Sequence, residues 1–208
     1  MKKNILKFTL YVTGAVILSL GIQLSILSKL GAAAYDAMNA NLHRFLNYYL
    51  SPKITLGNTM MITTVILFII TMILKPRAYY FFGLLLGLFV SFMIDVFGSF
   101  IPAPHVFFLQ VFYYLLALLT IAFGLALIIR SKLPMNSMDN LMMILTKKTK
   151  KPVGLIKTLL DVLYALLAIL FGFLCKIGFG AVNLGTLIMA LFTGTLINIF
   201  LKILKEIK

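Results

Sequence analysis

Six long apolar stretches dominate the chain and restrict what it can fold into. They cover Phe8–Leu27, Ile54–Leu74, Tyr79–Ile101, Val106–Ile129, Val153–Leu174 and Val182–Leu204. Each is close to the roughly 20 residues that cross about 30 Å of hydrocarbon. A soluble chain of 208 residues could not bury a composition that is 62% hydrophobic. The first stretch is longer than the apolar part of a signal peptide. We therefore expect an all-α, polytopic membrane protein with six transmembrane helices.

The basic residues predict how the chain is oriented. The net charge is +14, and most Lys and Arg lie between or beside the apolar stretches. If the N-terminus is cytoplasmic, only Lys29, Arg44, Lys53 and Lys176 of the 19 basic residues fall on outer segments. We therefore expect a protein of the cytoplasmic membrane with both termini inside. No basic stripe with interleaved aromatic residues is present, so nucleic acid is not an expected partner.

The chain also contains an internal repeat. A shift of 103 residues places Ser28-Lys29-Leu30 on Ser131-Lys132-Leu133 and Asp36 on Asp139. The same shift places "LFVSFMIDVF" on "LFTGTLINIF". We interpret residues 1–104 and 105–208 as two three-helix repeats within a single membrane domain. Because three is odd, the second repeat would enter the membrane from the opposite side, and this inverted topology occurs in many secondary transporters.

A short amphipathic or interfacial helix is expected after the first span of each half. Asn136 suits the N-cap of the second one, and Asp139 follows three residues later, as in a capping box. Ala33 stands at the matching cap position in the first half and has no side chain that could cap.

Two interpretations of Asp36 and Asp139 remain open. Both residues could be helix-start acids at the membrane interface, favoured by the helix dipole. Alternatively, they could line a central site, with Asn39 and Asn41 beside Asp36 and Asn140 beside Asp139.

Two further acids lie inside predicted spans. Intramembrane carboxylates are costly and suggest a function. Asp95 has no basic residue near it in the sequence, so it is the first candidate for an ion or proton site, with Asn198 as its counterpart in the other half. Asp161 is a second candidate, but it could equally form an ion pair with Lys157, four residues earlier.

No sequence motif predicts catalysis. The chain contains no phosphate-binding loop, nucleophile elbow or metalloprotease helix. Its one cysteine, Cys175, has no partner for a disulfide or a cysteine-based metal site. We expect no enzyme activity, no cofactor and no metal.

The repeated segments resemble the YczE/YitT group of bacterial membrane proteins. "SKLPMNSMDNLMMILTKKT" and "GFGAVNLGTLIMALFTGTLINIF" carry the resemblance in the second half, and "KLGAAAYDAMN" and "GLLLGLFVSFMIDVF" in the first. Tyr35 stands where this group is expected to have Trp. The resemblance covers nearly the whole chain. It implies a six-span protein of the bacterial cytoplasmic membrane and implies no substrate.

These features predict a small-solute transporter, with an ion or a proton as the coupling partner. Two alternatives stay open. The chain also resembles the substrate-binding membrane subunits of energy-coupling-factor vitamin importers, in its size, basic charge and span number. It could also be a non-transporting partner or assembly protein. The expected partners are the lipid bilayer and a small solute, and both a homo-oligomer and a membrane partner protein remain open.

Overall fold

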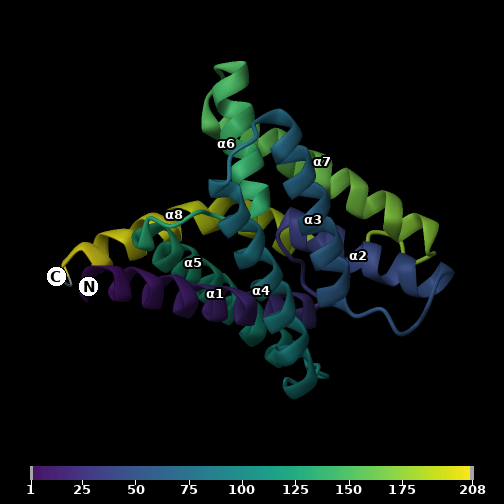
Figure 1. The fold of residues 1–208 in the computed structure, drawn as a ribbon. Helices are drawn as coiled ribbons and strands as arrows, with labels where there is room; N and C mark the ends of the chain where they lie inside the picture. The colour runs from purple at the N-terminus through teal and green to yellow at the C-terminus, as the bar shows by residue number, and fades with distance from the viewer. Residues whose placement is uncertain (1, 207–208) are drawn as a thin grey trace.

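The computed structural model describes residues 2–206, in which helices joined by loops are the regular secondary structure (Figure 1). Its eight helices are α1 (Lys2–Ser28), α2 (Ala34–Tyr49), α3 (Leu56–Leu74), α4 (Tyr79–Phe100), α5 (Phe107–Ser131), α6 (Ser137–Thr149), α7 (Val153–Leu174) and α8 (Leu184–Glu206).

The six predicted spans are confirmed as helices. The helices α1, α3, α4, α5, α7 and α8 are each long and apolar enough to cross a membrane. Most observed helix ends lie within two residues of the predicted ones, because hydropathy marks where the apolar stretch begins and stops. The other two helices, α2 and α6, follow the first span of each half. Both are shorter and far less apolar than the spans.

The repeated Ser-Lys-Leu segment ends a helix in the same way in both halves. The hydroxyls of Ser28 and Ser131 each donate a 2.6 Å hydrogen bond to a carbonyl three residues earlier. The lysine that follows, Lys29 or Lys132, has a φ of 60° or 59°, in the left-handed region. This conformation stops the helix and turns the chain. The phrase therefore specifies a helix end.

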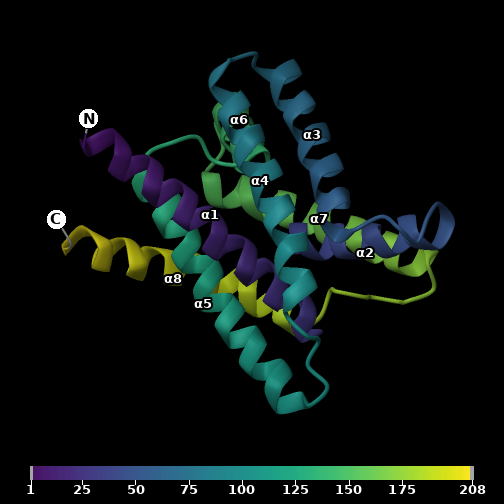
Figure 2. The same cartoon turned by 60° about the horizontal axis from the view of Figure 1, so that its bottom comes forward.

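The centre of the fold is the crossing of α1 and α5, which run diagonally across each other (Figure 2). A Cβ added at Gly21 would lie 2.8 Å from the backbone nitrogen of Ile121, and one added at Gly124 would lie 2.7 Å from that of Leu18. Only glycine allows the two backbones to approach this closely. Buried apolar side chains of α1 and α5 form most of the main core around this crossing.

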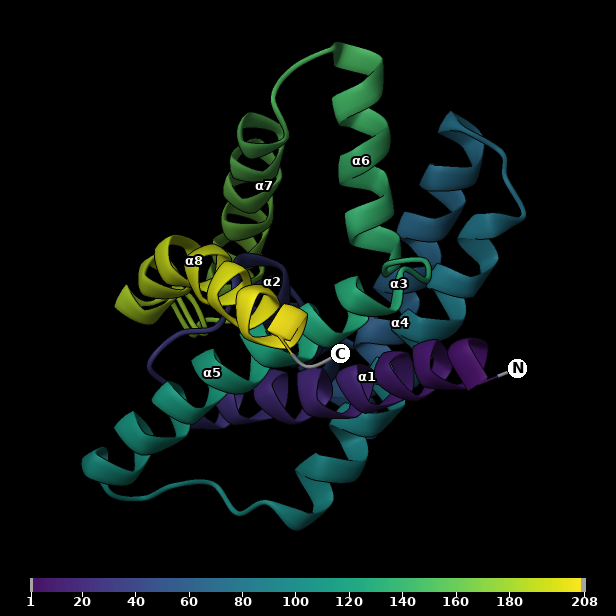
Figure 3. The same ribbon diagram turned by 90° about the vertical axis from the view of Figure 1, so that its left-hand side faces the viewer.

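The remaining helices lie on two sides of the α1–α5 pair. Helices α3, α4 and α6 form one group, while α2, α7 and α8 lie on the other side (Figure 3). Helix α2 packs along α7, and α6 packs along α3. Each short helix therefore packs on a span from the other half of the chain.

The two groups differ in one respect. Helix α4 packs along α3, whereas α8 packs on α5 and makes no contact with α7 within residues 2–206. Helices α7 and α8 consequently have the most exposed apolar surface among the six spans.

Candidate functional site

A small cavity of about 50 Å³ lies where the first turns of α2 and α6 approach each other. Its walls come from five helices. The polar residues that line it are Tyr35 and Asp36 of α2, Thr64 of α3, Ser91 of α4, and Asn136 and Ser137 at the start of α6. We call this space the central cavity. The starts of both short helices, α2 and α6, border this cavity. Asp36 lines the cavity, whereas Asp139 does not.

Asp36 is the buried acid of the central cavity. Its side chain is only 7% exposed, and no other residue within 2–206 forms a hydrogen bond with its carboxylate. Burial raises the pKa of Asp36 to about 7, and the negative charge of Asp161 adds to the rise. The backbone of Ala33 precedes the helix without a side-chain cap, as predicted.

Ser137 adds a second polar group without a partner. It is 2% exposed, lines the central cavity, and its hydroxyl makes no hydrogen bond within the described chain. Buried hydroxyls normally have a partner, because leaving one unpaired costs about 1–3 kcal/mol. A cavity of this size has room for a water molecule or a dehydrated cation. Asp36 and Ser137 together therefore form a site that could bind a proton, a water or a small cation.

Tyr35 is held in place at the edge of this cavity. Its hydroxyl lies 3.1 Å from the Thr63 hydroxyl, which in turn donates a 2.6 Å hydrogen bond to Asn39. Its ring packs edge-on against Tyr164 of α7, with the centroids 5.3 Å apart. The Tyr164 hydroxyl is also buried without a partner in the described chain. These contacts fix the start of α2 between α3 and α7.

Asp139 and Asp161 lie outside the central cavity. Asn136 caps α6 as predicted, since its side chain accepts a 2.9 Å hydrogen bond from the Asp139 amide. Asp139 is half-buried, and this burial raises its pKa to about 6. Asp161 forms the predicted ion pair with Lys157, at 2.6 Å. The Lys157 ammonium opposes the rise in the pKa of Asp139, while Asp161 adds to it.

Asp95 has a partner that its sequence neighbourhood does not reveal. One carboxylate oxygen accepts a hydrogen bond of 2.7 Å from the backbone amide of Gly57, and the other accepts one of 2.5 Å from the Thr55 hydroxyl. Thr55 is also the N-cap of α3. The carboxylate therefore ties α4 to the free amides at the start of α3. Asp95 does not line the central cavity.

The predicted asparagines are distributed over several places. Asn39 is fully buried and donates to the Tyr35 carbonyl. Asn140 bonds the Met135 carbonyl and thus helps to shape the start of α6. Asn41 bonds to α7 and to the loop after α7, and it does not line the central cavity. Asn198 is exposed on α8 and does not mirror the contacts of Asp95.

The sequence does not indicate that Thr64, Ser91 and Ser137 line the central cavity. Serine and threonine are common in apolar stretches, and the tertiary fold decides which of them point into a cavity. Within residues 2–206, no group of three or more His, Cys, Asp or Glu side chains is arranged to hold a metal ion.

The fold and its composition define a polytopic α-helical membrane protein. The chain belongs to a family of unknown function, DUF6198, whose model matches residues 5–202. It is 27% identical over 205 residues to the uncharacterized protein YyaS of Bacillus subtilis, covering 97% of this chain and 95% of that protein. It is also 27% identical over 196 residues to the uncharacterized membrane protein YczE of the same organism, covering 93% and 85%. The resemblance to the YczE group is thus confirmed. No solved structure matches the chain.

Proposed function

We propose that this protein moves a small solute across the membrane and that proton binding at Asp36 is coupled to the movement. One observation carries the proposal. Asp36 is buried in a cavity to which both halves of the chain contribute, and its carboxylate has no hydrogen-bond partner within residues 2–206. Burying an unpaired carboxylate lowers the stability of the fold, and a residue that is kept at such a cost suggests a function.

The charge of Asp36 can change under physiological conditions. An isolated buried carboxylate is unstable in the ionised form, so it takes up a proton or binds a cation. With a pKa of about 7, Asp36 gains or loses its proton near neutral pH. The ionised form would require a nearby cation or water, and the central cavity has room for either. A site of this kind suits coupling between proton binding and a conformational change.

We extend the proposal to the architecture, in which the two halves are inverted-topology repeats. Three sets of contacts support this. The two Ser-Lys-Leu turns are alike. Tyr11 and Tyr114 are 103 residues apart and occupy related places: the Tyr114 hydroxyl donates a 2.6 Å hydrogen bond to the Gly185 carbonyl, and the Tyr11 hydroxyl lies 3.5 Å from the matching Phe82 carbonyl, although its 2.6 Å bond goes to Pro134. The helix contacts also correspond between the halves. If α1 to α4 are matched in order with α5 to α8, the α2–α7 contact corresponds to α6–α3, and the α1–α4 contact corresponds to α5–α8.

The difference between the halves suggests how the solute would pass. Helices α3 and α4 are packed together and joined through Asp95, whereas α7 and α8 are separated. In transporters with inverted repeats, the halves exchange conformations around a fixed site to alternate access. We infer that the opposite state would separate α3 from α4 and bring α7 and α8 together.

A flux measurement tests the proposal. Wild-type protein and the Asp36→Asn variant are reconstituted in liposomes with an internal pH-sensitive dye, and a panel of small anionic, cationic and neutral solutes is added. We expect a solute-dependent pH change with the wild type and a loss of at least about tenfold with Asp36→Asn. Asp139→Asn is the matched control, because it makes the same chemical change at a half-buried carboxylate that does not line the central cavity.

Infrared spectroscopy tests the same site without a known solute. A protonated Asp36 should give a carboxyl band that titrates near pH 7 and is absent from Asp36→Asn. If Asp36 stays ionised from about pH 5 to 9, the coupling role is wrong. Stable co-purification with a pair of ATPase subunits would instead favour the importer-subunit alternative, and co-purification with an unrelated membrane enzyme would favour the partner-protein alternative.

A further inference from the structure

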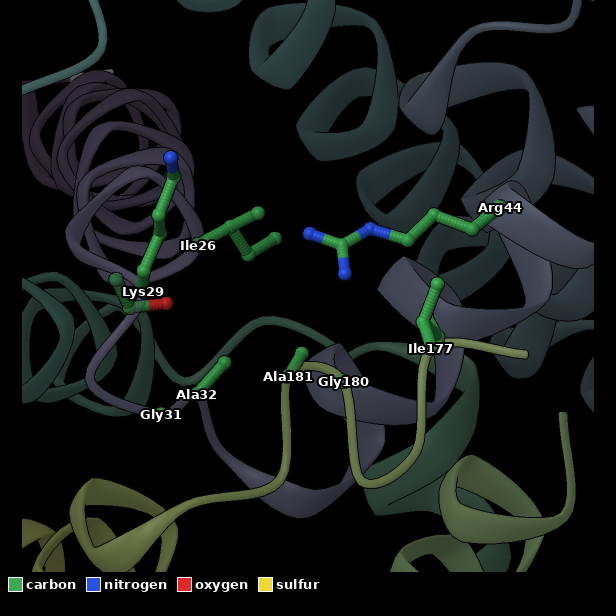
Figure 4. A pocket seen from close by; sticks show the side chains of 9 residues that line it. Ile26, Lys29, Gly31, Ala32, Arg44, Ile177, Gly180 and Ala181 are labelled. Atoms are coloured by element: carbon green, nitrogen blue, oxygen red, sulfur yellow. The ribbon is translucent and has the colours of Figure 1, made fainter. Parts of the chain in front are cut away.

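A second and larger cavity, of about 200 Å³, lies beyond the end of α1 (Figure 4). Four segments surround it: the end of α1, the loop at Gly31–Ala32, helix α2, and the loop that follows α7. Two of its lining side chains are basic, Lys29 and Arg44, and none is acidic. Arg44 extends into the space from α2, and Lys29 rises from the opposite wall. We call this space the basic pocket.

Neither cation of the basic pocket has an acidic partner within residues 2–206. The ion pair found within residues 2–206 is Lys157–Asp161, and neither of its residues lines the basic pocket. The chain has only five acidic residues. Two of them form side-chain hydrogen bonds with other residues: Asp95 with Thr55, and Asp161 with Lys157. Both side chains are exposed, so their positive charges are accessible to a ligand that enters the pocket, and no carboxylate on the pocket wall neutralises them. Their arrangement therefore favours a negatively charged ligand.

The walls of the basic pocket are fixed by hydrogen bonds. Asn41, one turn before Arg44 on α2, is fully buried. Its amide donates to the carbonyls of Ala168, at 2.8 Å, and Phe179, at 3.0 Å, and its oxygen accepts from the Ala181 amide at 2.9 Å. The Ala181 carbonyl in turn accepts from Ala32 at 3.2 Å. These bonds join the loop after α7 to α2 and to the loop after α1. A preformed pocket loses less ordering entropy when a ligand binds.

We infer that the basic pocket binds a small molecule through a carboxylate or phosphate group. The planar guanidinium of Arg44 can make two parallel hydrogen bonds to such an oxyanion, and Lys29 supplies a second positive charge. A volume of about 200 Å³ accommodates a phosphate or a small organic acid. The ligand could be a soluble anion or the headgroup of an anionic lipid, which share this chemistry. The inference does not depend on transport, because the pocket is separate from the central cavity.

Binding of inorganic phosphate tests the inference. The protein is placed in nanodiscs of phosphatidylcholine alone and titrated with sodium phosphate at constant ionic strength. We expect saturable binding that is weakened at least about tenfold in Arg44→Gln. Arg44→Lys should lose part of the affinity, since it keeps the charge but not the paired hydrogen bonds. Lys29→Gln is a second loss variant at the opposite wall.

Lys53→Gln is the matched control, since Lys53 is exposed, lies in the segment after α2 and does not line the pocket. A parallel arm adds phosphatidylglycerol to the nanodiscs and counts retained lipid by native mass spectrometry. Phosphate binding that depends on Arg44 but not on Lys53 supports a soluble ligand, and retained phosphatidylglycerol with the same dependence supports a lipid headgroup. If neither probe binds, or if Lys53→Gln weakens binding as much as Arg44→Gln, the inference is wrong.

Discussion

The carboxylate of Asp95 accepts a 2.7 Å hydrogen bond from the backbone amide of Gly57, which joins the far part of α4 to the first turn of α3. A Cβ at position 57 would collide with that carboxylate and with the carbonyl of Ser91. The close approach therefore requires both residues: a glycine on α3 and a short acid on α4. This relationship gives Asp95 a structural role and explains how an acid inside a span is stabilised.

The first prediction concerns this contact. Asp95→Ala should lower the free energy of unfolding by about 1–3 kcal/mol, because the amides at the start of α3 lose their acceptor. Asp95→Asn should cost less, since its amide oxygen can still accept from Gly57. Unfolding can be followed with a thiol-reactive dye, because Cys175 is the only cysteine and is buried. Full stability in Asp95→Ala would contradict the structural role.

The second prediction concerns the pH dependence of stability. An unfolded aspartate has a pKa near 3.9, and that of Asp36 in the folded protein is about 7. Between these values the folded protein binds more protons, so its free energy of unfolding falls as the pH rises. We expect the melting temperature to fall from about pH 5 to 8, and Asp36→Asn to exceed the wild type by roughly 5 °C at the upper end.

Scanning calorimetry in detergent would measure this effect. The raised pKa of Asp139 acts in the same direction, so Asp36→Asn should flatten the profile without abolishing it. Identical pH profiles for the wild type and Asp36→Asn would show that Asp36 does not take up a proton on folding.

The third prediction separates Asp161 from its ion pair with Lys157. Asp161→Asn should shift the titration of Asp36 to lower pH, because a negative charge that raises its pKa is removed. Stability should change by less than about 1 kcal/mol, since the side chain of Lys157 in this pair is 51% exposed. Lys157→Gln breaks the same pair but keeps the Asp161 charge. In Lys157→Gln, the infrared titration of Asp36 should therefore not shift to lower pH.

The fourth prediction concerns the attachment of α8. The buried hydroxyl of Tyr114 donates a 2.6 Å hydrogen bond to the carbonyl of Gly185, in the first turn of α8. Tyr114→Phe should cost about 1–2 kcal/mol, because the carbonyl loses its partner. Tyr113→Phe is the matched control. Its hydroxyl makes an exposed 3.3 Å bond to Pro102, and its removal should have little effect. Equal melting temperatures for the two variants would contradict the role of Tyr114.

Local patterns predicted the elements of this fold well. The spans follow from hydropathy, and the cap at Asn136 and the Lys157–Asp161 pair follow from spacing along one helix. Each of these features depends on residues within a few positions of each other. The shared site of the two repeated segments stays one of two interpretations that the sequence allows.

Contacts between distant segments could not be predicted in this way. The partner of Asp95 is a backbone amide 38 residues away, and the loop held by Asn41 lies up to 140 residues from it. Hydropathy carries no information about either pairing. The sequence presents Lys29 and Arg44 only as charges that set orientation, because nothing in it indicates that they line one pocket.

Helix α8 is the least buried of the six spans, and α1 is the most buried. Among the helices of residues 2–206, α8 contacts α5 and, at a few positions, α2, and its first turn also donates a hydrogen bond to the carbonyl of Leu30. The acyl chains of the surrounding bilayer are then its principal packing partners, and hydrocarbon thickness helps to set its tilt. For this part of the molecule, the lipid annulus acts as a component of the tertiary structure. The choice of lipid during purification will decide whether α8 keeps its place beside α5.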